Sequence, residues 1–285
     1  MCDECLAYRV GNITIEEFNS HMLLKDAALQ EKERDKTESA PTTLVVTEDT
    51  EALLISPQNN SSAMFYRTKL NVHNLTYYNL KTKDAMNYLW TENTAGLISS
   101  VFTSIHLDYL TEAIQENPSI SHIIVWSDGA VYQNKNAVLA DALRKFSAQH
   151  NVQITWKYLQ VGHTFMEGDS VHRCIENQLK QQDVNVPHDY VNIIKEARRR
   201  PAPYKVRFNE VLPQNFFKNY EYQQDIKTIR PGVKPSDPTV NDLKQIRYSS
   251  DGMISYKLAH DMEDFQPLPI MRRVGPPTDV TYPQL

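Results

Sequence analysis

The sequence predicts an α/β protein with a mixed sheet of five strands flanked by helices, a helical arm before it and a wrapping extension after it. Three observations indicate this class. After residue 43, short runs rich in β-branched residues replace a helical pattern. Residues 120–126 end in an uninterrupted apolar run over 123–126, typical of a central strand that is covered on both faces. The predicted elements follow the order strand, strand, strand, helix, strand, helix, strand, helix.

The segment 14–38 has the signature of one long helix. Thr14 can cap it, and Glu17, three residues later, completes a capping box. The apolar stripe of this segment is patchy, and residues 30–36 are almost wholly charged. We therefore expect a solvated or partner-binding arm rather than a core helix.

Periodicity and turn residues place the other elements. We predict strands at 44–49, 72–80, 85–90, 120–126 and 152–159, and helices at 96–115, 135–149, 169–182 and 187–200. The proline-rich end contains a hairpin, with strands at 245–248 and 253–258. The resulting division is an arm over 1–40, a core over 41–200 and an extension over 201–285.

Composition excludes several functional classes. The net charge of −5 argues against a simple basic nucleic-acid-binding module, but it is compatible with a nuclease whose carboxylates bind metal. With only 8 glycines the chain has no GxGxxG or Walker A loop, so we expect no nucleotide cofactor. No apolar run reaches the length of a membrane span, and the N-terminus does not resemble a signal peptide. Three cysteines do not form a disulfide framework, so we expect a nuclear or cytoplasmic protein.

Two acids stand at the ends of predicted strands. Asp49 ends the first strand, and Asp128 follows the long apolar one. Because ligands gather outside the carboxyl ends of parallel strands, we expect these side chains to lie together. Their repulsion would favour a bound Mg²⁺ or Mn²⁺, since hard oxygen ligands suit these ions. The alternative is that each Asp only caps a turn or a helix.

A third acid is expected from the helix after the fifth strand. Asp169, His172 and Glu176 share one face of that helix by their spacing. Asp169 lies in the first turn, nearest the strand ends, so we prefer it as the third metal ligand over Glu176. His172 would then orient a carboxylate. As alternatives, Asp169 is only a capping residue and Glu176 pairs with Lys180.

Further candidates surround these acids. Glu92, after the third strand, is a possible additional metal ligand, or else an exposed loop acid. Gln133, Asn134 and Asn136 follow Asp128 and either contact nucleic acid or cap the next helix. A basic cluster is a candidate DNA-backbone contact, with a solvated helix end as the alternative; it contains Lys195, Arg198, Arg199 and Arg200, then Lys205 and Arg207.

Cys2 and Cys5, with His21, resemble half of a zinc site. A structural zinc ion needs four ligands, and the sequence offers no second pair nearby. We therefore do not expect zinc to be a main cofactor.

Several motifs together resemble an uncharacterised, transposon-associated family of invertebrates. They are Ser127-Asp128-Gly129, Tyr132-Gln133-Asn134-Lys135-Asn136, and a run from Gly162-His163-Thr164 through Met166-Glu167 and Asp169-Ser170 to His172 and Ile175-Glu176. Shorter matches, including Trp90-Thr91-Glu92, extend the resemblance from about residue 43 to about residue 269. Two departures are Ala130 and Val131, where members usually carry Cys and often Thr. Fuller members carry more sequence upstream, so we expect this chain to begin inside such a protein.

The resemblance implies an RNase H-like domain of the DDE-transposase kind, whose element order agrees with the one predicted above. It implies two-metal cleavage or strand transfer on DNA, with Asp128 bridging two Mg²⁺ or Mn²⁺ ions and Asp49 and Asp169 each completing one. His163 would be a neighbouring polar or nucleic-acid contact. DNA is the expected partner, and self-association is a further expectation.

Two other functions remain open from the sequence. One is an inactive, domesticated or decayed transposon-derived protein that serves as a DNA- or protein-binding scaffold, because a fold does not determine function. The other is a mononuclear metal hydrolase that uses His163, Asp169 and His172, a reading that leaves Asp49 and Asp128 without a role.

Overall fold

The computed structural model describes residues 2–59, 68–180, 182–209 and 225–269, and its centre is one ten-stranded mixed sheet. The strands lie in the order β10-β9-β8-β6-β5-β1-β3-β4-β7, and β2 pairs with β3 outside this path. The bounds are β1 Thr43–Thr50, β2 Leu54–Ser56, β3 Leu70–Asn79, β4 Ala85–Thr91, β5 His122–Ser127, β6 Gln153–Tyr158, β7 Lys205–Asn209, β8 Gln245–Tyr248, β9 Ile254–Lys257 and β10 Gln266–Pro267.

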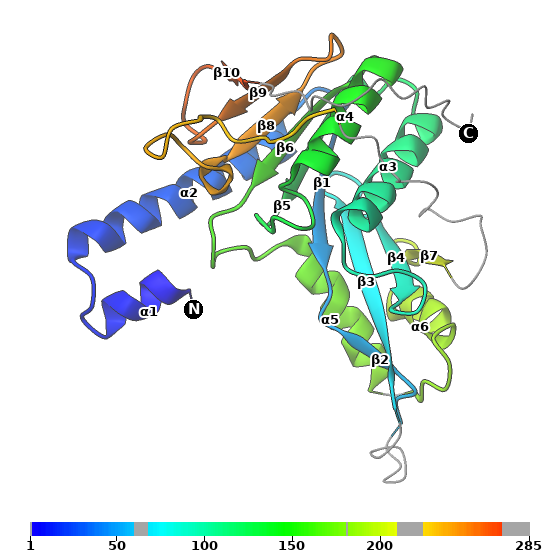
Figure 1. The fold of residues 1–285 in the computed structure, drawn as a ribbon. Coiled ribbons are helices and arrows are strands. Elements are labelled where there is room, and N and C mark those ends of the chain that lie inside the picture. The colour runs from blue at the N-terminus through cyan, green and yellow to red at the C-terminus, as the bar shows by residue number, and fades with distance from the viewer. Residues whose placement is uncertain (1, 60–67, 181, 210–224, 270–285) are drawn as a thin grey trace.

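Helices cover both faces of this sheet (Figure 1). One face carries α3 and α4, whose apolar residues join those of β1, β5 and β6 in the largest core cluster. The other face carries α2, α5 and α6. The bounds are α1 Asp3–Arg9, α2 Ile15–Glu38, α3 Ser99–Glu116, α4 Ala137–His150, α5 Glu167–Leu179 and α6 Asp189–Ala197. None of the described helices is both long enough and apolar enough to cross a membrane.

The predicted order of strands and helices is confirmed, because each predicted element has a counterpart shifted by only a few residues. β3 runs antiparallel to β1 and β4 runs antiparallel to β3, whereas β5 runs parallel to β1 and β6 runs parallel to β5. The prediction of five strands was wrong. The hairpin β8–β9 pairs with β6 and β7 pairs with β4, so the C-terminal extension lengthens the sheet at both edges. Short strands such as β2 and β7 give too little periodicity to be recognised.

The long N-terminal helix α2 forms as predicted, with Thr14 and Glu17 in a capping box. The expectation that its charged end is solvated was wrong for Glu31, Lys32 and Asp35, although Glu33, Arg34 and Lys36 are exposed. Glu31 and Lys32 are buried against the sheet, where Glu31 accepts a hydrogen bond from Lys157 of β6 at 2.6 Å. Asp35 accepts from the indole N–H of Trp126 at 2.8 Å and from Lys157 at 2.9 Å. The partners of these charges are far away in the sequence, so its local pattern could not reveal them.

Candidate metal centre and its surroundings

The two strand-end acids occupy matching positions on neighbouring parallel strands. Thr47 of β1 pairs with Trp126 of β5, and Asp49 and Asp128 each lie two residues further on. Both acids therefore lie at the carboxyl ends of the central strands, where ligands of parallel sheets bind. The sheet register therefore places the two acids at neighbouring strand ends.

The start of α5 brings the third acid to Asp49. The ligand atoms of Asp49, Asp169 and His172 all lie within 4.8 Å of one another. Gly168 makes this approach possible, because a Cβ atom there would lie 2.9 Å from the Cβ of Asp49. Asp169 also accepts a hydrogen bond from the Met166 amide at 2.7 Å, so the capping role left open by the sequence coexists with its place beside Asp49.

Glu48 is an acid of this region that the sequence analysis missed. It is 1% exposed, and one of its carboxylate oxygens has no hydrogen-bond partner among the described residues. The side-chain amide of Asn134 donates to Glu48 and to Asp128, at 3.2 Å in both cases. Residues next to each other in a strand point to opposite faces, so Glu48 and Asp49 lie on different sides of β1. An acid at an inward position of a strand was the signal that could have identified it.

The electrostatics of these acids favour a cation. Burial, followed by repulsion from Asp169 and Asp128, raises the pKa of Asp49 to about 7. Burial, followed by repulsion from Asp128 and Asp49, raises the pKa of Glu48 well above its usual value. Asp128 is therefore close enough to influence the carboxylates on both sides of β1. A divalent cation would relieve this repulsion, and carboxylate oxygens suit Mg²⁺ or Mn²⁺.

Two predicted metal ligands lie outside this group. Glu92 is exposed and accepts hydrogen bonds from the backbone and side-chain nitrogens of Asn71, at 3.0 and 2.8 Å. Glu176 is exposed on α5. Burial raises the pKa of Glu51 to about 8, and repulsion from Glu176 contributes to this rise. The geometry thus brings Asp169, rather than Glu176, to Asp49.

The predicted nucleic-acid contacts have mixed surroundings. Asn136 caps α4 by accepting from the Leu139 amide at 3.0 Å, and Gln133 is buried beside Thr50. Arg198 donates to the Ala202 carbonyl at 2.7 Å, whereas Lys195 and Arg199 are exposed. Lys205 pairs with Glu116, and Arg207 pairs with Asp108 and Glu112. The basic cluster is therefore partly neutralised within the protein.

His163 and His172, the two histidines of the run from residue 162 to residue 176, lie in different surroundings. His172 bonds to Thr76 at 3.0 Å and lies 3.9 Å from the Asp49 carboxylate, which is close to this acid but beyond hydrogen-bond distance. His163 instead faces Cys2, Cys5 and His21, with which it forms a second group of metal-ligating side chains. A mononuclear site containing both His163 and His172 does not fit this arrangement.

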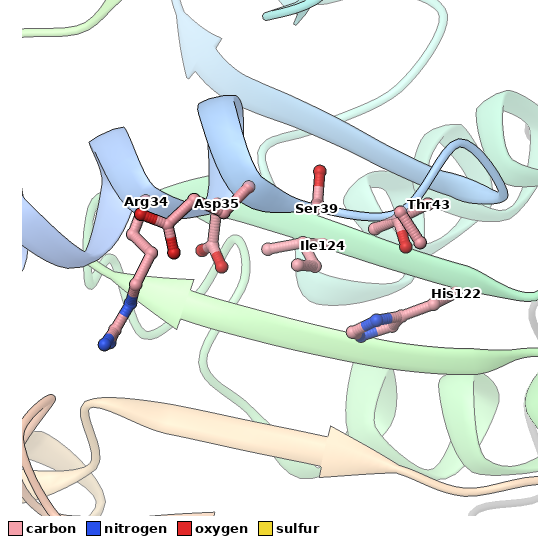
Figure 2. Close-up of a pocket in the computed structure, with 8 residues that line it drawn as sticks. Arg34, Asp35, Ser39, Thr43, His122 and Ile124 are labelled. Carbon is pink, nitrogen blue, oxygen red and sulfur yellow. The ribbon is translucent and has the colours of Figure 1, made fainter.

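A shallow pocket lies at the opposite end of the central strands (Figure 2). Arg34, Asp35 and Ser39 line it from the end of α2, and Thr43 and His122 line it from the starts of β1 and β5. Thr43 and His122 pair at the amino ends of the parallel strands. Glu48, Asp49, Asp128 and Asp169 do not line this pocket, so it is separate from the candidate metal centre.

We found no match to this chain among protein-family models, curated proteins or solved structures. The assignment of a function therefore depends on the geometry of the site and on the sequence motifs.

The raised pKa of Asp49 predicts an unusual pH dependence in the absence of metal. The folded chain holds this proton up to about pH 7, whereas a free Asp loses it near pH 4. Between these values the folded state binds more protons, so the contribution of Asp49 to the free energy of unfolding falls as pH rises. With a chelator present, we expect Asp49→Asn to gain about 2–4 kcal/mol relative to wild type between pH 4 and pH 8.

Urea unfolding of both proteins at pH 4, 6 and 8 measures this difference. Buried histidines such as His172, whose pKa burial lowers to about 4, change stability in the opposite direction. Their contribution is shared by both proteins and largely cancels in the comparison. Glu176→Gln is the control, because Glu176 is exposed on the same helix. A constant difference between Asp49→Asn and wild type would contradict the burial of a repelled carboxylate.

Gly168→Ala is expected to push α5 away from β1. The new Cβ would meet the Cβ of Asp49 at 2.9 Å and its carboxylate at 3.2 Å, so the helix must move. We expect a destabilisation of about 1–3 kcal/mol and weaker Mn²⁺ binding. Unfolding and calorimetry measure the two effects. Gly96→Ala is the matched control, since a Cβ there meets nothing within 4 Å; equal effects of the two substitutions would refute the close approach.

Proposed function

We propose that this chain is the metal-dependent nuclease core of a transposase-like protein, acting on DNA phosphodiester bonds. The observation that carries the proposal is the convergence of Asp49 and Asp169, with Asp128 at the matching position on the adjacent parallel strand. Asp49 and Asp169 can share a divalent cation, and Asp128, which lies outside the group of ligand atoms within 4.8 Å, is the neighbouring acid at the next strand end. The raised pKa of Asp49 supports a site built for positive charge.

The topology supports the RNase H-like reading. Three consecutive strands run antiparallel in the order β4-β3-β1, and β5 and β6 then continue the sheet parallel to β1. Asp49 lies in β1, Asp128 directly follows β5, and Asp169 lies in α5, the helix after β6. These are the positions that the family resemblance implies for DDE-type acids.

The chain's own residues can position the reacting groups. Bound Mg²⁺ or Mn²⁺ would supply activation of water or of a 3′-hydroxyl and stabilisation of the leaving oxygen. Asp49 and Asp169 provide oxygen ligands from β1 and α5, and His172 lies beside Asp49. Asn134 fixes Asp128 by donating a hydrogen bond to it at 3.2 Å. Glu48, which shares this donor, is an additional ligand candidate on the other face of β1.

A catalytically silent scaffold is the second candidate. The net charge of −5 and the internal ion pairs of Lys205 and Arg207 favour it, because they reduce the basic surface available to DNA. Ala130 and Val131, which depart from the family pattern close to Asp128, also favour it.

Incubation of the purified chain with labelled single- and double-stranded DNA distinguishes the two candidates. The nuclease predicts cleavage that requires Mg²⁺ or Mn²⁺ and stops when a chelator is added. DNA binding without cleavage at any metal concentration would favour the scaffold and overturn the proposed activity. An activity that a chelator leaves intact would indicate a contaminating enzyme or metal-independent chemistry.

A further inference from the structure

A second group of metal-ligating side chains lies where the N-terminal helices meet the loop between β6 and α5. Cys2 precedes α1, Cys5 lies within it, and His21 lies in the second turn of α2. His163 comes from the distant loop between β6 and α5, 142 positions after His21. The ligand atoms of all four residues lie within 4.8 Å of one another.

The separations of these atoms are those of a tetrahedral metal site. With Zn–S bonds of about 2.3 Å and Zn–N bonds of about 2.05 Å, a regular tetrahedron gives S···N separations of about 3.5 Å. Cys2 Sγ lies 3.2 Å from His21 Nε2 and 3.4 Å from His163 Nε2. Cys5 Sγ lies 3.7 and 3.4 Å from the same two nitrogens. The two nitrogens are 2.9 Å apart, close to the roughly 3.3 Å expected for two ligands of one zinc ion.

The surroundings support these four residues as ligands. The carboxylate of Glu4 contacts Nδ1 of His21, an arrangement that orients the ring and leaves Nε2 facing the cysteines. The Cys5 amide donates to Cys2 Sγ at 3.3 Å, which suits a negatively charged sulfur. Gly162, with φ of 74°, packs so closely that a Cβ there would lie 2.0 Å from the Cβ of Cys2. The loop is therefore shaped to bring His163 to the two cysteines.

We propose that Cys2, Cys5, His21 and His163 bind one structural Zn²⁺ ion that fastens α1 and α2 to the β6–α5 loop. Two thiolates and two imidazoles favour zinc over Mg²⁺ or Mn²⁺, which prefer oxygen ligands. Four protein ligands complete the tetrahedron and leave no position for a substrate, so the ion has a structural role. The sequence analysis named three of the four ligands, Cys2, Cys5 and His21, and missed His163 because it reaches the site through the tertiary fold.

One ligand of the proposed zinc ion, His163, lies close in sequence to the part of α5 that carries Asp169 of the candidate metal centre. The loop that carries His163 leads directly into α5, whose first turn contains Asp169. Lys32 of α2 donates to Glu167 at the start of α5, at 2.6 Å, and forms a second tie between the same elements. The zinc ion would hold the N-terminal helices and the beginning of α5 together. Its existence does not depend on nuclease activity, since its ligands are separate from Asp49 and Asp128.

Metal analysis of the full chain, purified under reducing conditions and desalted after addition of Zn²⁺, tests the site directly. We expect one zinc ion per chain. Replacement by Co²⁺ should give the visible absorption of a tetrahedral ion together with thiolate-to-cobalt charge-transfer bands. Cys5→Ser and His163→Asn should lose the ion or weaken its binding, whereas Cys174→Ser should retain both the ion and the spectrum. Glu4→Gln should weaken binding by about 10- to 100-fold.

The wild-type protein decides the question even if the ligand variants fail to fold. Absence of zinc after desalting, or a cobalt spectrum without thiolate bands, would overturn the proposal. So would an unchanged metal content in Cys5→Ser and His163→Asn. Asp49→Asn should keep its zinc while losing the Mg²⁺- or Mn²⁺-dependent activity. Failure of the nuclease proposal is thus measured separately from failure of the zinc proposal.

Discussion

Asp169→Asn is expected to lower the rate of metal-dependent DNA cleavage by about 10³-fold or more, equivalent to about 4 kcal/mol of activation free energy. The carboxylate of Asp169 lies beside the carboxylate of Asp49 and the ring of His172, so Asp169 and Asp49 can share a cation. Asparagine keeps an oxygen that can accept from the Met166 amide, so the start of α5 should remain capped. The loss would therefore reflect the missing negative charge rather than an unfolded helix.

Glu176→Gln is the matched control, because Glu176 lies on the same helix but is exposed. Single-turnover cleavage with Mg²⁺ and with Mn²⁺ should show a rate within a few-fold of wild type for this variant. Asp128→Asn should resemble Asp169→Asn if both acids serve one site. Full activity of Asp169→Asn together with loss in Glu176→Gln would identify Glu176 as the third acid and refute our assignment.

Lys157→Met is expected to destabilise the fold by about 3–5 kcal/mol. The ammonium group of Lys157 is buried and donates to Glu31 at 2.6 Å and to Asp35 at 2.9 Å. Removing it leaves Asp35 without this cationic partner and Glu31 with only the guanidinium of Arg34, and the two carboxylates remain close together against the sheet. Because whole domains are stable by only about 5–15 kcal/mol, urea unfolding should register a large part of the total.

Lys36→Met is the matched control for this substitution. Lys36 pairs with Glu33 at 3.1 Å on the exposed side of the same helix, and exposed pairs contribute about 0–1 kcal/mol. Adding Glu31→Gln and Asp35→Asn to Lys157→Met should recover part of the lost stability, since the unpaired charges are then removed. If Lys157→Met and Lys36→Met both destabilised the fold only slightly, the result would contradict the burial of the Lys157 ion pairs between α2 and the sheet.

Local sequence signals were sufficient for most elements of the fold. The capping box of Thr14 and Glu17, the apolar run that becomes β5 and the hairpin β8–β9 depend on residues close together in the chain. The burial of α2 could not be predicted in this way. Its charged residues look solvated until Lys157 and Trp126, from distant strands, are placed opposite them.

The candidate metal centre was partly predictable for a similar reason. Asp49 and Asp128 end strands whose parallel pairing follows from the order of elements, so their approach could be inferred. Glu48 was missed because the search for ligands considered only acids at strand ends, and Glu48 lies one residue before the strand-end acid Asp49. His163 was expected near the acids but lies with Cys2, Cys5 and His21, and these partners could not be inferred because they lie more than 140 residues earlier in the chain.

The most direct test of the metal centre is a crystal structure of the chain grown with Mn²⁺, with anomalous scattering recorded to locate the ion. The account predicts an anomalous peak about 2–2.5 Å from carboxylate oxygens of both Asp49 and Asp169, with Asp128 beside it. The same experiment on Asp49→Asn should show no peak at this position. Manganese bound elsewhere in the wild-type protein, with none at Asp49 and Asp169, would contradict the account.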